Sequence, residues 1–361
     1  MPIEFAARLR NIPVYPAADG YAHSGPLVKL ASNETPFPPL PAVVEAITRS
    51  LSGLNRYPDP TNSALRKRLS DRYGVPGPRI AIGNGSCDIL LAAGQALLEP
   101  GAEVVYAWPS FSVYPHLAAA ADARAVTVPL DSEHRHDLDA MAAEVTAATR
   151  LAIVCNPNNP TSTALPLDAI GAFLDRVPRH ACLIVDEAYC EFNLLDDPDA
   201  SIELLDRFPN LVLLRTFSKV HGLCGLRVGY ALCGSEQFRT AVDQVRQPFF
   251  CNAAAQVAAL EALAHQDEVA RRVEQTVAAR LGLDAGLREV GFEPADSQAN
   301  FVWFGVGDAE DEAAAVDGLA QRGIVVRAGT PLGREGFLRV TVGLPEENAR
   351  FLEALRECRP G

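Results

Sequence analysis

Lysine is scarce in this chain of 361 residues. Only three of its 32 basic residues, Lys29, Lys67 and Lys219, are lysines, and every other one is an arginine. Arginine remains charged in proteins, whereas a lysine amine can lose its proton when it is buried or lies beside another cation. Lys219, which follows the apolar run 211–214, is therefore a candidate for Schiff-base chemistry, although a solvated loop position is the usual fate of a single lysine.

The chain also lacks the features of several other protein classes. Its formal net charge is −13, which argues against nucleic-acid binding as the main task but is compatible with a local arginine pocket for a small anion. It has no apolar stretch long enough to cross a bilayer and no apolar signal core near its start. Its eight cysteines form no CxxC pair and no metal-ligand spacing with histidine, so we expect no metal site. Several cysteines lie in apolar runs, as reduced thiols do, and we expect a cytoplasmic protein.

Short apolar runs and helical patterns alternate along most of the chain. This alternation predicts an α/β fold with a mostly parallel sheet flanked by helices, followed by a smaller α/β unit. We expect an N-terminal arm with part of the small domain (1–45), a large domain (46–275) and a small C-terminal domain (276–361). Residues 252–290 are expected to form one long connecting helix, and Asp137 is expected to cap a helix that runs to about residue 148. The acidic cluster 308–312 is expected to be a solvated helix start.

A glycine turn at residues 83–88, Gly-Asn-Gly-Ser-Cys-Asp, separates a short expected strand from a helix. Free backbone N–H groups and the helix dipole at such a turn favour an anion, so the turn is a candidate phosphate site. A plain connecting turn explains the same residues about as well. The third glycine of a dinucleotide fingerprint and the lysine of a P-loop are both missing.

Polar clusters follow three of the expected strands, at residues 156–161, 186–189 and 218–219. Ligands of open α/β sheets gather at the carboxyl ends of the strands. A carboxylate, a lysine and a phosphate site at these ends together suit pyridoxal phosphate, which needs an anion beside its ring nitrogen and donors for its phosphate. Each residue also has an ordinary explanation: Asp186 as a helix cap, Asn159 as a turn residue, and Tyr189 as a packing aromatic.

The chain resembles the fold-type I pyridoxal-phosphate aminotransferases, and within them the histidinol-phosphate aminotransferase group, over nearly its full length. The motifs that carry the resemblance are KLASNETPFPPLP (29–41), RYPDP (56–60), GNGSCD (83–88), CNPNNPTST (155–163), DEAYCEF (186–192), RTFSKVHGLCGLRVGY (215–230), SQANF (297–301), GIVVRAG (323–329) and LRVTVG (338–343). The resemblance implies that the large domain binds pyridoxal phosphate.

The resemblance also implies roles for the residues of the three clusters. Lys219 would form the Schiff base with the cofactor and move the proton of the reaction. Asp186 would pair with the ring nitrogen, Asn159 and Tyr189 would bind the 3-oxygen, and Phe111 would stack on the ring.

A second group of implied residues binds phosphate and substrate. The phosphate would be held by Gly85, Ser86, Ser218 and Arg227, with Tyr57 from a neighbouring subunit, so the resemblance implies a homodimer with a shared active site. The substrate would lie near Arg339, Arg327, Tyr15 and Asn33, with Trp108 and Asn252 affecting its selection.

The resemblance implies transamination between L-histidinol phosphate and 2-oxoglutarate in histidine biosynthesis. Thr35, Trp108 and Ser162 depart from that group and are similar to the aromatic amino-acid aminotransferases, so phenylalanine is the alternative donor. A cofactor-binding sensor without catalysis is a further alternative. The acidic balance and the lack of a basic helix-turn-helix segment count against it.

Overall fold

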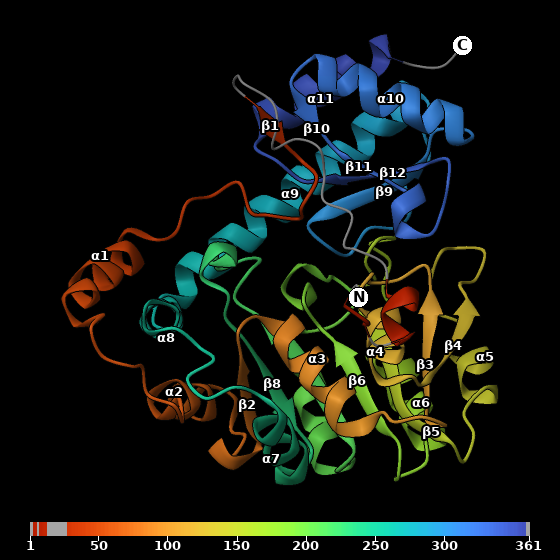
Figure 1. Ribbon diagram of the computed structural model, residues 1–361. Helices are drawn as coiled ribbons and strands as arrows, with labels where there is room; N and C mark the ends of the chain where they lie inside the picture. Colours follow the sequence, from red (N-terminus) through yellow and green to blue (C-terminus); the bar gives the residue numbers. More distant parts are fainter. Residues whose placement is uncertain (1–2, 6, 13–26, 359–361) are drawn as a thin grey trace.

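The main sheet has seven strands, six of which run in one direction. The structure, a computed structural model, describes residues 3–5, 7–12 and 27–358. The strand order is β2-β8-β7-β6-β5-β3-β4, and β8 alone is antiparallel to its neighbours (Figure 1). The strands are β2 (Ile80–Gly83), β3 (Glu103–Trp108), β4 (Arg124–Pro129), β5 (Thr149–Cys155), β6 (Cys182–Asp186), β7 (Leu211–Thr216) and β8 (Gly229–Cys233). The predicted α/β class with a mostly parallel sheet is confirmed.

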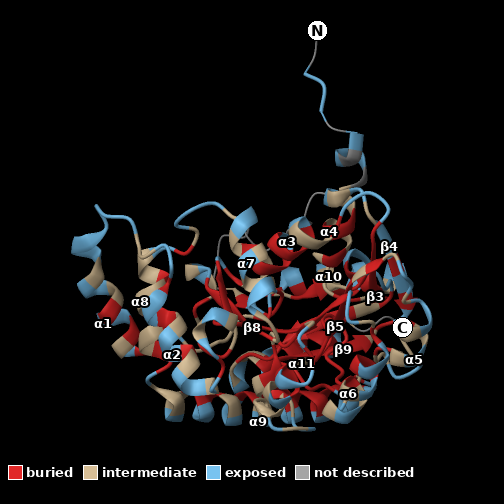
Figure 2. Cartoon of the chain, turned by 90° about the horizontal axis from the view of Figure 1, so that it is seen from below, coloured by how far each residue is buried: buried red, intermediate tan, exposed pale blue. Residues whose placement is uncertain are grey.

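Helices cover both faces of this sheet, which explains the unbroken apolar runs of its strands. In β6, Leu183 and Val185 belong to one core cluster and Ile184 to the other, so successive side chains pack on opposite faces. Figure 2 shows the strands as the most deeply buried part of the chain, with exposed residues on the outer sides of the helices. The helices of this part are α1 (Pro41–Ser50), α2 (Ser63–Tyr73), α3 (Ser86–Leu97), α4 (Tyr114–Ala121), α5 (Leu138–Ala143), α6 (Leu167–Arg176), α7 (Glu236–Val245) and α8 (Ala253–Ala262).

A second, smaller unit packs beside the carboxyl ends of the main strands. It contains a three-stranded antiparallel sheet in the order β11-β12-β9 and the parallel pair β1-β10. Its elements are β1 (Val28–Lys29), α9 (Gln266–Val290), β9 (Phe301–Gly305), α10 (Ala309–Gln321), β10 (Ile324–Val325), β11 (Arg327–Ala328), β12 (Phe337–Thr341) and α11 (Pro345–Glu357). The N-terminal strand β1 therefore shares a core with elements almost 300 residues later. The division of the chain at residues 45 and 275 stays a prediction, and α9 runs without interruption through residue 275.

Two predictions about individual elements are wrong, and two helices were not predicted. The expected single helix over 252–290 is two helices, α8 and α9, separated at residues 263–265. The helix that Asp137 caps ends at Ala143 instead of about residue 148. Helices α4 and α7 have no predicted counterpart, and α7 buries only Val242 fully, so it carries little apolar signal.

Candidate active site

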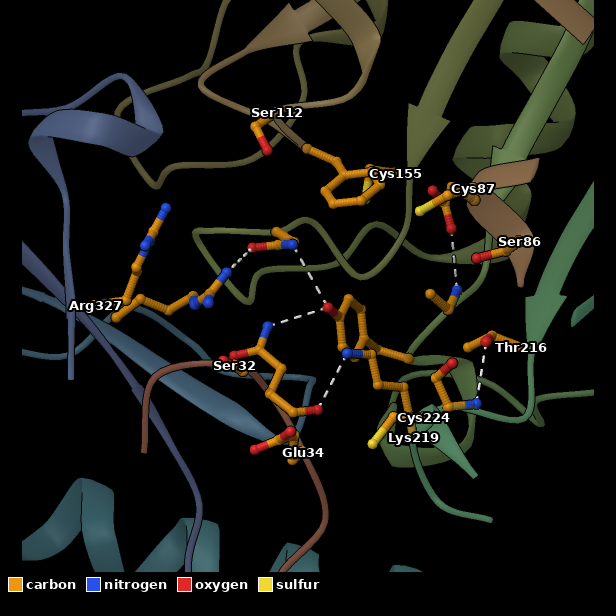
Figure 3. A pocket seen from close by; sticks show the side chains of 18 of the residues that line it. Ser32, Glu34, Ser86, Cys87, Ser112, Cys155, Thr216, Lys219, Cys224 and Arg327 are labelled. Carbon is orange, nitrogen blue, oxygen red and sulfur yellow. Dashed lines mark hydrogen bonds between the residues drawn. The ribbon is translucent and has the colours of Figure 1, made fainter. Parts of the chain in front are cut away.

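A cavity of about 430 Å³ lies between the carboxyl ends of the main strands and the small sheet. Cys155, Asp186 and Thr216, the last residues of β5, β6 and β7, line it from one side. Arg327 and Arg339, on β11 and β12, line it from the other. In Figure 3, Arg327 points into the cavity from the small sheet, and Ser86 and Cys87 lie on the opposite side. The cavity therefore gathers the three polar clusters that the sequence places at strand ends.

Asp186 is a buried carboxylate that receives two hydrogen bonds. The hydroxyl of Tyr114, on α4, donates to its Oδ2 at 2.9 Å, and the backbone N–H of Ala188 donates to its Oδ1 at 3.3 Å. Burial raises the pKa of Asp186 to about 6, although both donors favour the charged form. The carboxylate is thus charged at neutral pH and able to attract a cationic group in the cavity.

Lys219 follows β7 and extends its amine into the same cavity. Its Nζ donates to the carbonyl oxygen of Asn33 at 3.1 Å and lies 5.2 Å from the centre of the Tyr189 ring. Burial, and after it the positive charge of Arg339, lowers the pKa of Lys219 to about 8. About a tenth of this amine is therefore neutral and nucleophilic at pH 7, a far larger fraction than for an ordinary lysine.

A chain of amide and hydroxyl groups connects the small sheet to the main sheet. Arg339 donates to Oδ1 of Asn159 at 2.6 Å, and the amide nitrogen of Asn159 lies 3.5 Å from the Tyr189 hydroxyl. The amide nitrogen of Asn33 donates to the same hydroxyl at 3.0 Å. Because the hydroxyl oxygen accepts from two amides, its own hydrogen can donate to an oxygen in the cavity.

The candidate phosphate site lies where the N-terminus of α3 meets Arg227. Gly85, with φ +84°, precedes α3, and a Cβ at this position would lie 2.3 Å from Nη2 of Arg227. Nη1 of Arg227 donates to Oγ of Ser218 at 3.3 Å. The free N–H groups of the helix, a hydroxyl and a guanidinium thus lie at one end of the cavity, which is a suitable set of donors for a phosphate.

Arg327 and Arg339 face one another across two antiparallel strands. Their Cα atoms are register partners, and both side chains are buried and line the cavity. Like charges directly opposite in a sheet are destabilising. An anion bound in the cavity near both guanidinium groups would relieve this repulsion.

Two groups that support the site were not predicted. Tyr114, which donates to Asp186, lies three residues after Phe111, a spacing that could have indicated a common location. Asn158 accepts from Ser110 at 2.7 Å and contacts Nε2 of His136 at 3.1 Å, which holds the loop that carries Asn159. Burial lowers the pKa of His136 to about 4, so its ring is neutral.

Most of the predicted site residues line the cavity, but three of those that the structure describes lie elsewhere. Phe111, Ser86, Ser218, Arg227, Asn33, Asn159, Asp186, Tyr189, Lys219, Arg327 and Arg339 line it, and Gly85 directly precedes Ser86. Tyr57 is 81% exposed and stacks on Phe249. Asn252 caps α8 instead of lining the cavity, and Trp108 packs on the small unit outside it. Tyr15 lies outside the described residues.

The described part of the chain contains neither a membrane-spanning helix nor a cluster of metal ligands. None of its helices combines the length and apolar character that crossing a bilayer requires. Within the same residues, no group of three or more His, Cys, Asp or Glu side chains could hold a metal ion.

Comparison with known proteins gives one consistent family. Residues 25–355 match the model of "Aminotransferase class I and II". An aromatic amino acid aminotransferase of Streptomyces coelicolor is 43% identical over 98% of this chain and 97% of its own length. A histidinol-phosphate aminotransferase 2 of Ralstonia nicotianae is 44% identical over 92% of this chain and 88% of its own. A histidinol-phosphate aminotransferase of Sinorhizobium meliloti, solved with pyridoxal-5′-phosphate, superposes with a TM-score of 0.89 at 31% identity, covering 98% and 97% of the two chains.

The cavity has groups that match each part of pyridoxal phosphate. The buried carboxylate of Asp186 suits a protonated ring nitrogen, and the Lys219 amine suits an aldehyde. Gly85 has a φ of +84°, which other residues rarely adopt, and its lack of a Cβ leaves room for the Arg227 guanidinium beside the turn. The residues present therefore fit this cofactor.

Gly85→Ala is expected to weaken binding of pyridoxal phosphate. The added Cβ would displace the Arg227 guanidinium from the phosphate site, and loss of a charged hydrogen bond corresponds to about a tenfold or greater rise in Kd. Fluorescence titration of the cofactor-free protein measures this Kd. Gly225→Ala is the matched control, because a Cβ there meets open space. An unchanged Kd in Gly85→Ala would argue against this phosphate site.

The rate of pyridoxal-phosphate capture is expected to report the pKa of Lys219. Since the neutral amine attacks and its pKa is lowered to about 8, the rate constant should rise with pH and level off above about pH 8, whereas an ordinary lysine would level off near about 10.4. Stopped-flow absorbance measures the rate, with a free lysine derivative as reference for the titration of the cofactor. Arg339→Gln should move the inflection to higher pH, and a rate that keeps rising to pH 10 would contradict the prediction.

Proposed function

Since the chain belongs to the class I and II aminotransferase family and is a pyridoxal-phosphate-dependent transaminase, we propose that it transfers the amino group of L-histidinol phosphate to 2-oxoglutarate. The products are imidazole acetol phosphate and glutamate. This donor is supported mainly by one observation, that Arg327 and Arg339 are register partners on neighbouring strands and both line the cavity.

The two guanidinium groups favour a strongly charged anion. A phosphate ester carries close to two negative charges at neutral pH and offers three acceptor oxygens. Arginine presents planar donors that bind phosphate or carboxylate with two parallel hydrogen bonds. The same pair accepts a phosphate from the donor and a carboxylate from 2-oxoglutarate, as the two halves of the reaction require.

Pyridoxal phosphate, when bound, supplies an electron sink for the bonds of the substrate's α-carbon. Lys219 would hold its aldehyde, and the Lys219 amine would move the proton at the α-carbon of the substrate. The lowered pKa of about 8 suits this task, because the amine both accepts and returns a proton near neutral pH.

Other residues hold the cofactor and set its charge. Asp186, ionised above its pKa of about 6, would pair with the ring nitrogen and favour its protonated form. Asn159 and the Tyr189 hydroxyl would donate to the 3-oxygen, and Phe111 would pack against the ring. Arg227 would bind the phosphate, and Gly85, Ser86 and Ser218 would complete its site.

An aromatic amino acid is the second candidate donor. The Streptomyces coelicolor relative supports it, since that protein is named for aromatic amino acids and is 43% identical over 98% of the chain. Thr35, Trp108 and Ser162 favour the same donor. The Ralstonia nicotianae relative, at 44% identity, supports histidinol phosphate to a similar degree.

We also propose that the protein works as a homodimer in the cytoplasm. Tyr57 is exposed, stacks on Phe249 with ring centres 4.5 Å apart, and does not line the cavity of its own chain. Three large apolar side chains that precede it in the chain are also exposed, namely Val44, Leu51 and Leu54. Such a patch suits a subunit interface through which Tyr57 reaches the phosphate of the partner's cofactor. The eight cysteines are free thiols, which suits a reducing compartment.

The donor is tested by steady-state kinetics with L-histidinol phosphate and L-phenylalanine against 2-oxoglutarate. We expect kcat/KM to be at least about tenfold higher for histidinol phosphate, because its phosphate bonds to both arginines. Arg327→Gln should lower kcat/KM for histidinol phosphate by about tenfold or more, and by less for phenylalanine. A preference of the native enzyme for phenylalanine would overturn the first donor and favour the second.

The shared site is tested by mixing two inactive or weakened variants. Tyr57→Ala lowers activity at limiting cofactor, and Lys219→Ala abolishes it. Dissociated and reassembled as a 1:1 mixture, they should recover about a quarter of native activity, because mixed dimers then contain one site with both residues. No recovery, or a monomer in sedimentation analysis, would contradict the proposed dimer.

A further inference from the structure

Glu312, on α10, is a buried carboxylate far from the catalytic lysine. Its position in the acidic cluster 308–312 predicts a solvated side chain. The structure shows Asp308 and Asp311 forming an exposed capping box, whereas Glu312 is only 3% exposed. The prediction is wrong for Glu312, and a buried carboxylate needs donors to compensate its lost hydration.

The hydrogen bonds to this carboxylate come from one loop and from the first residue of the strand that follows it. Thr330 donates its backbone N–H to Oε1 at 3.0 Å and its hydroxyl to Oε2 at 3.1 Å. The backbone N–H groups of Gly336 and Phe337 donate to Oε2 at 2.7 and 3.3 Å. Glu312 thus joins the beginning of the loop to its end.

This loop, residues 329–336, connects the two strands that carry the arginines. It lies between β11, with Arg327, and β12, with Arg339, and its Leu332 lines the active-site cavity. Gly333 and Gly336 have φ of +96° and +76°, a conformation that other residues rarely adopt. The two glycines allow the loop to adopt this conformation, and the hydrogen bonds to Glu312 hold it.

The opposite side of the loop contacts the main sheet through Trp108. A Cβ at Gly333 would lie 2.5 Å from the indole Nε1 of Trp108, the last residue of β3. The loop is thus held between a carboxylate of the small unit and an indole of the main sheet. Any shift of it would move Leu332 relative to the cavity.

We propose that loop 329–336 forms the surface against which the side chain of the amino donor packs. Glu312 is the positioning residue that fixes the conformation of this loop. Glu312 contacts neither substrate nor cofactor and acts through Leu332 and the strands of Arg327 and Arg339. The inference rests on the proposed function only in that the donor carries a ring that reaches the loop.

The first test compares Glu312→Gln with the native enzyme. The amide has nearly the same shape but replaces one acceptor oxygen by a donor, which opposes the N–H groups of the loop. We expect kcat/KM for the preferred donor to fall about tenfold, mainly through KM, while the Kd for pyridoxal phosphate stays within about twofold. Glu310→Gln, the same change at an exposed position of the same helix, should leave both values unchanged.

A double-mutant cycle with Leu332→Ala tests whether Glu312 acts through the loop. Coupled residues show non-additive effects. The kcat/KM of the double variant should therefore lie within about twofold of the kcat/KM of the poorer single variant. Gly333→Ala, which displaces the loop from the side of Trp108, should lower kcat/KM for the preferred donor in the same way. This variant replaces Glu312→Gln as the test if Glu312→Gln does not fold. Additive effects, an unchanged KM, or an equal loss of cofactor affinity would overturn the proposal.

The kinetics are measured with both L-histidinol phosphate and L-phenylalanine. A native preference for phenylalanine would refute the proposed donor but leave the role of the loop intact, because the loss is measured on whichever donor the native enzyme prefers.

Discussion

Three neighbouring parallel strands, β5, β6 and β7, must end at the same edge of their sheet, and the active site depends on that constraint. The register pairs Cys155 with Asp186 and Asp186 with Leu214, so the loops that follow begin side by side. Residues separated by dozens of positions, Asn159, Asp186 and Lys219, thereby line one cavity. The antiparallel β8 begins at the same edge, because Gly229 pairs with Thr216, and Arg227 just before it meets the turn that precedes α3.

This dependence explains which parts of the site the sequence could predict. Parallel strands appear as apolar runs, and the polar residues that follow them must meet, so Lys219 and Asp186 were predictable by position. Tyr114 was not, because its bond to Asp186 spans 72 residues and depends on how α4 lies on the sheet. Glu312 was predicted to be solvated but is buried, because the local sequence of an acidic helix start is the same in both cases. The break between α8 and α9 is likewise set by packing, because α8 contacts α1 and α2 whereas α9 continues to β9 and α11.

The small unit makes its contribution through long-range contacts that no local pattern reveals. Asn33 follows β1, yet its carbonyl accepts from Lys219 and from Asn300, and its N–H donates to Thr341. One residue of the N-terminal segment therefore connects the catalytic lysine with the sheet that carries the arginines. Its positive φ of 54° is tolerated by asparagine better than by most residues.

The scarcity of lysine has a chemical consequence for a protein that handles an aldehyde. Pyridoxal phosphate reacts with any accessible neutral amine, and side reactions at the surface would consume the cofactor. Lys67 is highly exposed but paired with Asp71 at 2.7 Å, and Lys29 is the other lysine outside the cavity. Arginine supplies most of the positive charge of this surface without adding primary amines. The composition therefore directs the aldehyde towards Lys219 by leaving it few lysine amines elsewhere.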